Sequence, residues 1–199
     1  IQQGIAQKLQ NIWEPLFSDS SYGYRPRRSG QQAIQKVKEY AEEGYRYAVS
    51  VDLSKYFDTL NHELLMNLLH RKIQDMRVLR IIKKYLKSGV MENGVVSKTE
   101  EGSPQGGPLS PLLANIYLNE FDWKMHSRGV KTVRYADDIV VFAKSKRAAE
   151  RLLEFSRKYL EGKLKLKMNT EKSKVTSIFA VKEFKFLGFC IGKNGSGIY

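Results

Sequence analysis

The feature that most constrains this chain is a pair of adjacent acidic residues, Asp137 and Asp138, between two apolar segments. Val133 precedes the pair, and the apolar run 139–142 follows it directly. This spacing predicts two strands within 131–142 that are joined by a tight turn. Asp is common in ordinary polar turns. However, two adjacent carboxylates repel one another, and partial burial worsens the repulsion, so the pair also indicates a functional site.

A third acidic residue follows another predicted strand. Apolar and polar or small side chains alternate over 45–53, which predicts a strand that ends near Asp52. Taken alone, Asp52 could equally be a helix cap. Magnesium prefers hard oxygen ligands such as carboxylates. Three Asp carboxylates from two neighbouring strand ends can therefore hold two Mg²⁺ ions, the usual arrangement for phosphoryl transfer.

The order of the remaining elements predicts the fold class. Hydrophobic periodicity predicts helices at 2–17, 29–43, 61–69, 77–87, 110–127 and 146–160, and an Asn-Gly pair predicts a hairpin at 90–98. Asn61 and Ser110 are expected to cap helices. The apolar segment 184–191 is expected to be a last strand that pairs with 175–179. This mixed order predicts an α+β fold with a split βαβ sheet, not a doubly wound parallel sheet.

Charge favours a polyanionic partner. The chain carries 34 basic and 21 acidic residues, a net charge of +13, and residues 140–199 hold 14 of the basic and 5 of the acidic ones. Such an excess suits nucleic acid, with a solvated basic surface as the alternative. The single cysteine, Cys190, excludes an intrachain disulfide, and an intracellular location is expected. No apolar run approaches the roughly 18 residues of a transmembrane helix, so no membrane partner is expected.

Five motifs, in order, resemble the reverse transcriptase family, specifically the type encoded by group II introns. They are Tyr-Gly-Tyr-Arg-Pro-Arg-Arg-Ser at 22–29, Asp-Leu-Ser-Lys-Tyr-Phe-Asp at 52–58 followed by Asn61-His62, the Gly/Pro-rich stretch and helix start at 102–115, Tyr-Ala-Asp-Asp at 135–138, and Phe-Leu-Gly-Phe at 186–189. The resemblance covers essentially the whole chain. It implies a reverse-transcriptase palm with a ferredoxin-like antiparallel sheet and helices on one face, plus partial, largely helical fingers.

The resemblance also implies how the chain is divided. Residues 1–199 would be a single fingers–palm fragment, with 1–44 and about 70–100 on the fingers side and about 45–69 and 101–199 in the palm. The first fingers segments and the thumb would lie beyond its ends. Because those parts grip the nucleotide and the primer, this fragment alone is expected to polymerise poorly. A cytoplasmic, nucleic-acid-associated protein is expected.

The function implied is an RNA-directed DNA polymerase that adds deoxynucleotides to a primer 3′ end for intron mobility, with a maturase role in splicing. Asp52, Asp137 and Asp138 would be catalytic and would hold two Mg²⁺ ions together with the carbonyl of Leu53. Phe57 would collide with a ribose 2′-hydroxyl and so select deoxynucleotides, and Gln105 would contact the nucleotide. Lys172, in a lysine-rich segment, would lie near the departing pyrophosphate and donate a proton.

Further residues are implied contacts of the nucleic acid. Arginines interleaved with aromatic residues suit phosphate contact and base stacking, although a solvated basic loop remains the alternative for each. Leu187 and Gly188 would form the primer grip. The predicted nucleic-acid contacts are Tyr22, Arg25, Arg27, Arg28, Pro104 and Gly106.

Three other functions share parts of this pattern. One is a non-catalytic RNA-binding maturase, but a carboxylate cluster repels phosphate unless metals are present, which argues against pure binding. Another is a reverse transcriptase of a retron, a diversity-generating element or a CRISPR-associated system, and the motifs are most similar to the intron type. The third is a nucleotidyl cyclase or an RNA-dependent RNA polymerase. The Tyr-Ala-Asp-Asp box and the aromatic residue at position 57 favour DNA synthesis.

Overall fold

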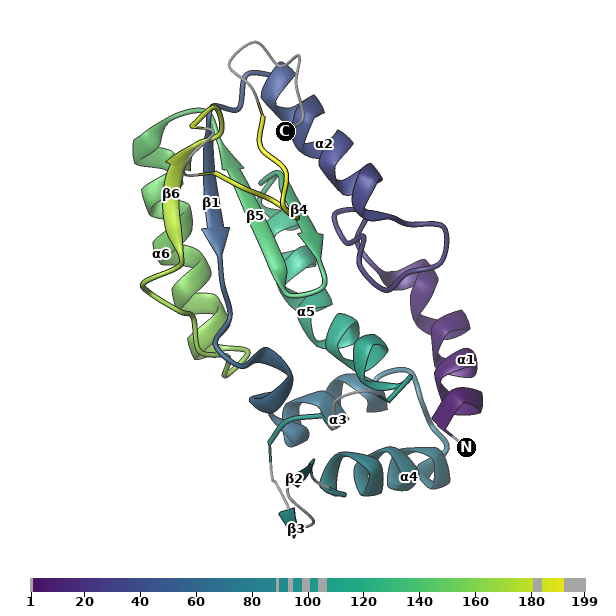
Figure 1. Cartoon of the computed structure of the whole chain (residues 1–199). Helices are drawn as coiled ribbons and strands as arrows, with labels where there is room; N and C mark the ends of the chain where they lie inside the picture. Colours follow the sequence, from purple (N-terminus) through teal and green to yellow (C-terminus); the bar gives the residue numbers. More distant parts are fainter. Residues whose placement is uncertain are drawn as a thin grey trace.

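An antiparallel sheet with the strand order β4-β5-β1-β6 lies at the centre of the protein (Figure 1). The structure is a computed structural model that describes residues 2–88, 101–103, 107–180 and 184–191, and the backbone of 90–92 and 95–97. The strands are β1 (Tyr47–Val51), β4 (Thr132–Tyr135), β5 (Asp138–Ala143) and β6 (Lys174–Ser177). Helices connect β1 to β4 and β5 to β6, so the predicted split βαβ arrangement and the α+β class are confirmed.

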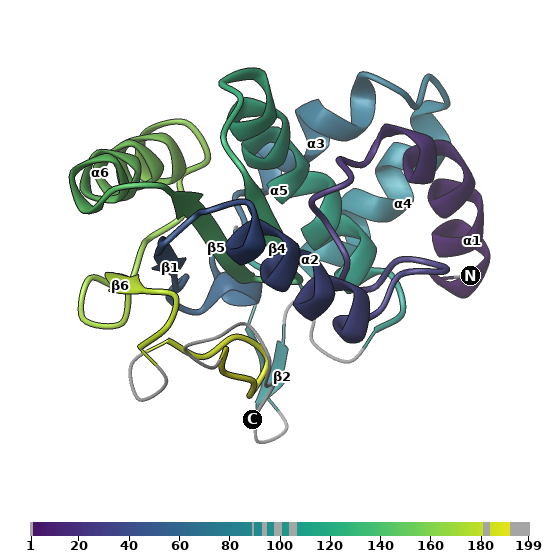
Figure 2. The same cartoon turned by 90° about the horizontal axis from the view of Figure 1, so that it is seen from above.

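One face of the sheet is covered by α5 (Ser110–Ser127) and α6 (Lys146–Gly162), as Figure 2 shows. Val49, Val51 and Val141 face this side and belong to one core with the apolar residues of both helices. Helix α5 also contacts α1 (Gln2–Trp13) and α3 (His62–His70). It is therefore buried on most of its circumference, which explains why its apolar residues do not keep to one stripe.

The opposite face is covered as well, by α2 (Gly30–Glu42) and by residues 184–191 (Figure 2). Val37 of α2 and Phe184 share a second core with Val140 and Phe142 of β5. Both faces of β5 are thus buried, which explains its continuous apolar sequence. We expected helices on one face of the palm sheet. Helix α2, which lies in the segment predicted as fingers, packs on the other face.

Beyond the end of the sheet at which β1 finishes lie η2 (Tyr56–Asp58), α3, α4 (Met76–Lys87) and the hairpin of β2 (Val90–Glu92) and β3 (Val95–Ser97) (Figure 1). Asn61 caps α3 as predicted, because its side-chain oxygen accepts a hydrogen bond from the Leu64 amide at 2.9 Å. None of the helices in the described part of the chain is long and apolar enough to cross a membrane.

The structure corrects three local predictions. Helix α1 ends at Trp13, and a 3₁₀ turn, η1 (Glu14–Leu16), follows because Pro15 cannot continue an α-helix. Ser110 does not cap α5. It is the first helical residue, and its hydroxyl lies 2.7 Å from those of Tyr85 and Ser103.

The third correction concerns the C-terminal segment. Strand β6 pairs with β1, Tyr47 opposite Ser177, and not with 184–191. Within 184–191 the chain turns sharply, since Leu187 and Gly188 have φ of 50° and 82° and Phe186 exchanges two 2.9 Å backbone hydrogen bonds with Phe189. Apolar composition marked this segment as buried, but it did not specify strand pairing.

Candidate active site

Strand register brings the three acidic residues to one end of the sheet. Strands β1 and β5 pair antiparallel with Val51 opposite Ile139, so Asp52 leaves β1 at the level at which Asp138 begins β5. Tyr135 pairs with Asp138, so Ala136 and Asp137 form a two-residue turn between them. The prediction that the two acidic positions lie at neighbouring strand ends is therefore confirmed.

The three carboxylates interact electrostatically. The pKa of Asp138 is raised, first by partial loss of solvation and then by the negative charges of Asp137 and Asp52. Asp52 and Asp137 are partly buried, and Asp138 is exposed. None of the three forms an ion pair with a cation among the described residues. Their charge is thus left without a partner from the described part of the protein.

The chemistry of this donor set fits a divalent cation. Carboxylate oxygens are hard ligands that Mg²⁺ prefers, and a cation would favour the charged form of Asp138, whose pKa is raised by partial loss of solvation and by the neighbouring acids. As the side chains stand, no group of three or more His, Cys, Asp or Glu within the described residues is arranged to hold a metal ion. A bound cation would have to draw the carboxylates together.

The loop 169–173 holds the backbone of Asp52 in place through hydrogen bonds that the sequence did not predict. The Asp52 amide donates to the Ser173 hydroxyl at 3.0 Å, and the Asp52 carbonyl accepts from the Asn169 amide at 2.9 Å. Asn169 also accepts from the Lys172 amide at 3.3 Å through its side-chain oxygen. Lys172 is exposed and directly precedes Ser173, so it belongs to the loop that holds the Asp52 backbone.

Phe57 lies beside the start of the Gly/Pro-rich loop. Its ring is half-buried and packs 5.3 Å from the Tyr56 ring, measured between centroids. The Phe57 carbonyl accepts a hydrogen bond from the Ser103 amide at 2.6 Å, and a Cβ on Gly102 would lie 2.8 Å from the Asp58 carbonyl oxygen. Pro104, Gln105 and Gly106 lie outside the described residues.

Two of the predicted nucleic-acid contacts are internal. Arg25 is buried, and its guanidinium donates to Glu14 at 2.8 Å, to the Ser18 carbonyl at 2.7 Å and to the Ser21 carbonyl at 2.8 Å. Tyr22 is only 4% exposed and belongs to the core under α2. The folded chain already uses the Arg25 donors and covers the Tyr22 ring, which argues against nucleic-acid contact by either side chain, so both contacts stay predictions.

The rest of this loop remains accessible. Arg27 is exposed, and Tyr24, next to Arg25, is 54% exposed. Arg28 is partly buried, forms an ion pair with Asp19 at 2.5 Å and lies 5.3 Å above the Tyr22 ring. Tyr24 thus offers the exposed aromatic surface that the sequence motif suggested for Tyr22.

The predicted primer-grip residues form the tight turn described above. Gly30 at the start of α2 lies between this turn and Tyr135, because a Cβ on Gly30 would be 3.4 Å from Leu187 and 3.8 Å from Tyr135. Leu187 and Gly188 are therefore held on the α2 face, near the turn that carries the acidic pair.

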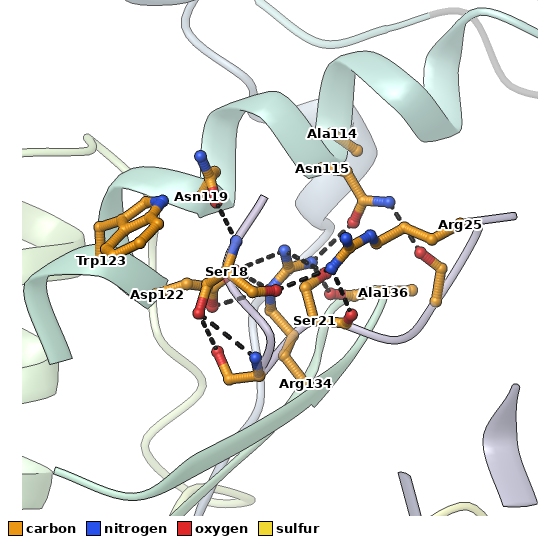
Figure 3. A network of polar contacts seen from close by, with 12 residues as sticks. Ser18, Ser21, Arg25, Ala114, Asn115, Asn119, Asp122, Trp123, Arg134 and Ala136 are labelled. Carbon is orange, nitrogen blue, oxygen red and sulfur yellow. Dashed lines mark hydrogen bonds and ion pairs between the residues drawn. The ribbon is translucent and has the colours of Figure 1, made fainter. Parts of the chain in front are cut away.

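A buried polar network lies behind that turn (Figure 3). Arg134 is fully buried and forms an ion pair with Asp122 of α5 at 2.6 Å. Neither residue was singled out from the sequence. A signal was nevertheless present, because an arginine in an apolar strand and an aspartate beside Phe121 in an apolar helix each need a partner when buried.

Comparison with known proteins agrees with this arrangement. Residues 1–191 match the family described as reverse transcriptase (RNA-dependent DNA polymerase). The chain is 36% identical to "Protein YkfC" of Escherichia coli (strain K12), over 89% of this chain and 57% of that protein. It is 30% identical to "Group II intron-encoded protein LtrA" of Lactococcus lactis subsp. cremoris, over 99% of this chain and 43% of that protein. The chain thus spans about half the length of these relatives.

Among solved structures, the apo telomerase from Candida tropicalis truncated from its C-terminal domain superposes with a TM-score of 0.75. The superposition covers 100% of this chain and 44% of that one. Sequence identity over it is 15%, so this likeness is one of fold alone.

Proposed function

The chain belongs to the reverse transcriptase (RNA-dependent DNA polymerase) family, and we propose that it forms the fingers–palm part of an enzyme that copies RNA into DNA. The relatives include a group II intron-encoded protein, which confirms the resemblance drawn from the motifs. In this proposal the sheet with α5 and α6 belongs to the palm, and α4 with the β2–β3 hairpin lies on the fingers side.

The observation that carries the proposal is the placement of Asp52, Asp137 and Asp138 at one sheet end without a cation from the described part of the protein. These carboxylates, with the Leu53 carbonyl, would hold two Mg²⁺ ions. When bound, such ions stabilise the attacking and leaving oxygens of an in-line phosphoryl transfer. The protein supplies the positioning: β1 and the 169–173 loop fix Asp52, and the β4–β5 turn fixes Asp137.

Two further side chains would act on the incoming nucleotide. Phe57, held beside the carboxylate end by η2 and by Ser103, would press against the sugar and reject a ribose 2′-hydroxyl. Lys172 is exposed on the loop that fixes Asp52, and it would donate a proton to the leaving pyrophosphate. Gln105 is proposed to contact the template base and the nucleotide, from its place in the motif alone.

Helix α4 supports RNA as the macromolecular partner. Helices α4 and α6 each carry five basic residues, but α4 has no acidic residue and α6 has three. In α6, Arg157 and Lys158 form ion pairs with Glu154. In α4, Arg80 and Lys84 are exposed and form no ion pair within the described residues. Unpaired surface cations of this kind attract the phosphates of a nucleic acid.

The names of the relatives favour the intron setting. A group II intron-encoded protein is among them, and so is "Nuclear intron maturase 2, mitochondrial" of Arabidopsis thaliana, at 26% identity over 64% of this chain. We therefore propose that the template includes group II intron RNA, that the primer is DNA, and that the protein also assists splicing. A maturase that binds RNA without catalysis is the second candidate, and the α4 surface would serve it equally.

Primer extension tests the polymerase activity. The full-length protein is given an RNA template, a DNA primer, deoxynucleotides and Mg²⁺, and is compared with the Asp137→Ala/Asp138→Ala variant. Extension by the native protein, and its loss in a variant that still binds RNA, supports the proposal. A native protein that binds intron RNA tightly but never extends the primer shows that the non-catalytic maturase is the correct function.

The salt dependence of RNA affinity tests whether the basic surface of α4 binds RNA. Arg80→Gln/Lys84→Gln is expected to reduce the slope of log K against log salt by about 1.4 to 1.8, because each phosphate contact contributes about 0.7 to 0.9. Arg157→Gln on α6 is the matched control and should leave the slope unchanged, since Glu154 already pairs with Arg157. Equal changes from both helices would exclude α4 as the RNA-binding face.

A further inference from the structure

We infer that Asn115 and Arg134 are positioning residues that hold the turn carrying Asp137 and Asp138 in its working conformation. This inference rests on the proposed function, because it assumes that these carboxylates are catalytic. Neither residue touches the proposed reaction site. Both act through backbone groups of the turn and of the loop packed on it (Figure 3).

The first component is Arg134, whose donors join three segments of the chain. Its Nη1 group donates to the Ala136 carbonyl at 2.8 Å and to the Asn115 side-chain oxygen at 2.7 Å. Its Nη2 group donates to the Ser21 hydroxyl at 2.8 Å. A fully buried guanidinium has a fixed fork geometry. One side chain therefore ties the turn to α5 and to the loop before α2.

The second component is Asn115, which is 1% exposed on α5. Its oxygen accepts from Arg134, and its amide donates to the Gly23 carbonyl at 2.7 Å. Gly23 packs directly on the turn, since a Cβ there would overlap the Ala136 backbone nitrogen and lie 3.0 Å from the Tyr135 carbonyl carbon. Asn115 therefore fixes both the guanidinium under the turn and the glycine loop against it.

The turn needs such support because its backbone is strained. Ala136 has φ of 58°, a left-handed conformation that is unfavourable for an L-residue with a Cβ atom. The hydrogen bond from Arg134 to the Ala136 carbonyl opposes relaxation of this residue. Relaxation would redirect Asp137, the next residue in the chain.

Asn119 provides a matched control one helical turn away. Its side chain also joins α5 to the preceding loop, accepting from the Ser18 amide at 3.1 Å and donating to the Leu16 carbonyl at 3.1 Å. Within the described part of the protein, the Asn119 side chain makes no hydrogen bond to Arg134, Gly23 or the turn. A purely structural link between helix and loop would make the two asparagines equivalent.

The test compares Asn115→Ala with Asn119→Ala in the full-length protein. We expect Asn115→Ala to lower kcat for nucleotide addition by about tenfold to a hundredfold, with KM for the nucleotide within about twofold, because a misplaced catalytic group affects the chemical step. Asn119→Ala should change neither. Binding of Mn²⁺, followed by electron paramagnetic resonance, should weaken in Asn115→Ala alone, and this readout needs no turnover.

Rescue separates positioning from general stability. Glycine adopts φ of about 60° without strain, so Asn115→Ala/Ala136→Gly should regain part of the lost kcat and Mn²⁺ affinity. If Asn115→Ala does not fold, Asn115→Asp keeps the acceptor for Arg134, removes the donor to Gly23 and should show the same kinetic split. Equal behaviour of the Asn115 and Asn119 variants, in an active native enzyme, overturns the inference. A native protein that neither extends a primer nor binds Mn²⁺ refutes the proposed function, and the inference with it.

Discussion

Asp122 lies in the buried network behind the β4–β5 turn, and Asp138 directly follows that turn, yet the surroundings of the two carboxylates differ completely. Asp122 is 1% exposed, and both of its oxygens accept hydrogen bonds from Arg134 at 2.6 to 3.0 Å. Asp138 is exposed, has no ion pair within the described residues, and has its pKa raised by partial loss of solvation and by two further acids. One carboxylate is fully paired inside the protein, and the other is left with uncompensated charge.

The difference shows how structural charges can be told from functional ones. A buried acid with an arginine partner satisfies its own charge and stabilises the fold around it. An acid kept beside like charges at the surface destabilises the fold unless a ligand neutralises it. Uncompensated charge is therefore the better sign of a binding site, and the same distinction separates Arg25 from Arg27 in the basic loop.

The largest effect is expected for activity. Asp137→Asn should reduce the rate of primer extension on the order of a thousandfold, because a neutral amide cannot replace a carboxylate at a two-metal site. The thermal unfolding midpoint should stay within a few degrees. Glu150→Gln, an acid on the outer side of α6, is the control and should retain the native rate. Native-like extension by Asp137→Asn would place the catalytic carboxylates elsewhere.

A large loss of protein stability is expected when the buried Arg134–Asp122 ion pair behind the turn is broken. Asp122→Asn leaves the buried Arg134 charge unpaired and should lower the free energy of unfolding by about 3–5 kcal/mol. Denaturant titration measures this change. The double variant Asp122→Leu/Arg134→Met should be less destabilised than Asp122→Asn, since it buries no lone charge. A single variant with native stability would mean that this ion pair does not support the fold.

An intermediate effect is expected in the basic loop. Arg25→Ala should lower the free energy of unfolding by about 1–3 kcal/mol, because it removes the guanidinium that donates to the Ser18 and Ser21 carbonyls and pairs with Glu14. The affinity for RNA should be unchanged under conditions in which the variant is folded. Arg27→Ala should do the reverse, weakening RNA binding without loss of stability. Weakened RNA binding by folded Arg25→Ala would restore the original sequence-based role of Arg25.

The smallest expected effect is the contribution of Asp138 to the pH dependence of folding stability. Its folded pKa is raised, so the native state binds a proton more readily than the unfolded chain, and stability falls as pH rises through this window. Asp138→Asn should therefore stabilise the metal-free protein at pH 7, by less than about 1 kcal/mol because the group is solvent-screened. Mg²⁺ should raise the unfolding midpoint of the native protein more than that of the variant. An opposite sign would show that Asp138 has a cationic partner.

The sequence predicted the elements well where local chemistry determines them. Periodicity and capping residues located α2, α3, α4 and α6, and the acidic turn was recognised from its apolar flanks. The sequence did not distinguish buried from exposed residues of one loop, since the burial of Arg25 depends on Glu14 in a distant turn. The Arg134–Asp122 pairing was missed for the same reason: tertiary contact, not spacing, brings the two charges together.

The most direct measurement is a titration of Mn²⁺ into the full-length protein with a deoxynucleotide and a primer–template that lacks the 3′-hydroxyl. Electron paramagnetic resonance counts the bound ions in the native protein and in Asp52→Asn and Asp137→Asn. If the three carboxylates form the metal site, the native protein binds about two ions with nucleotide present, and each variant loses at least one. Equal numbers of bound ions in all three proteins would contradict a metal site at this end of the sheet.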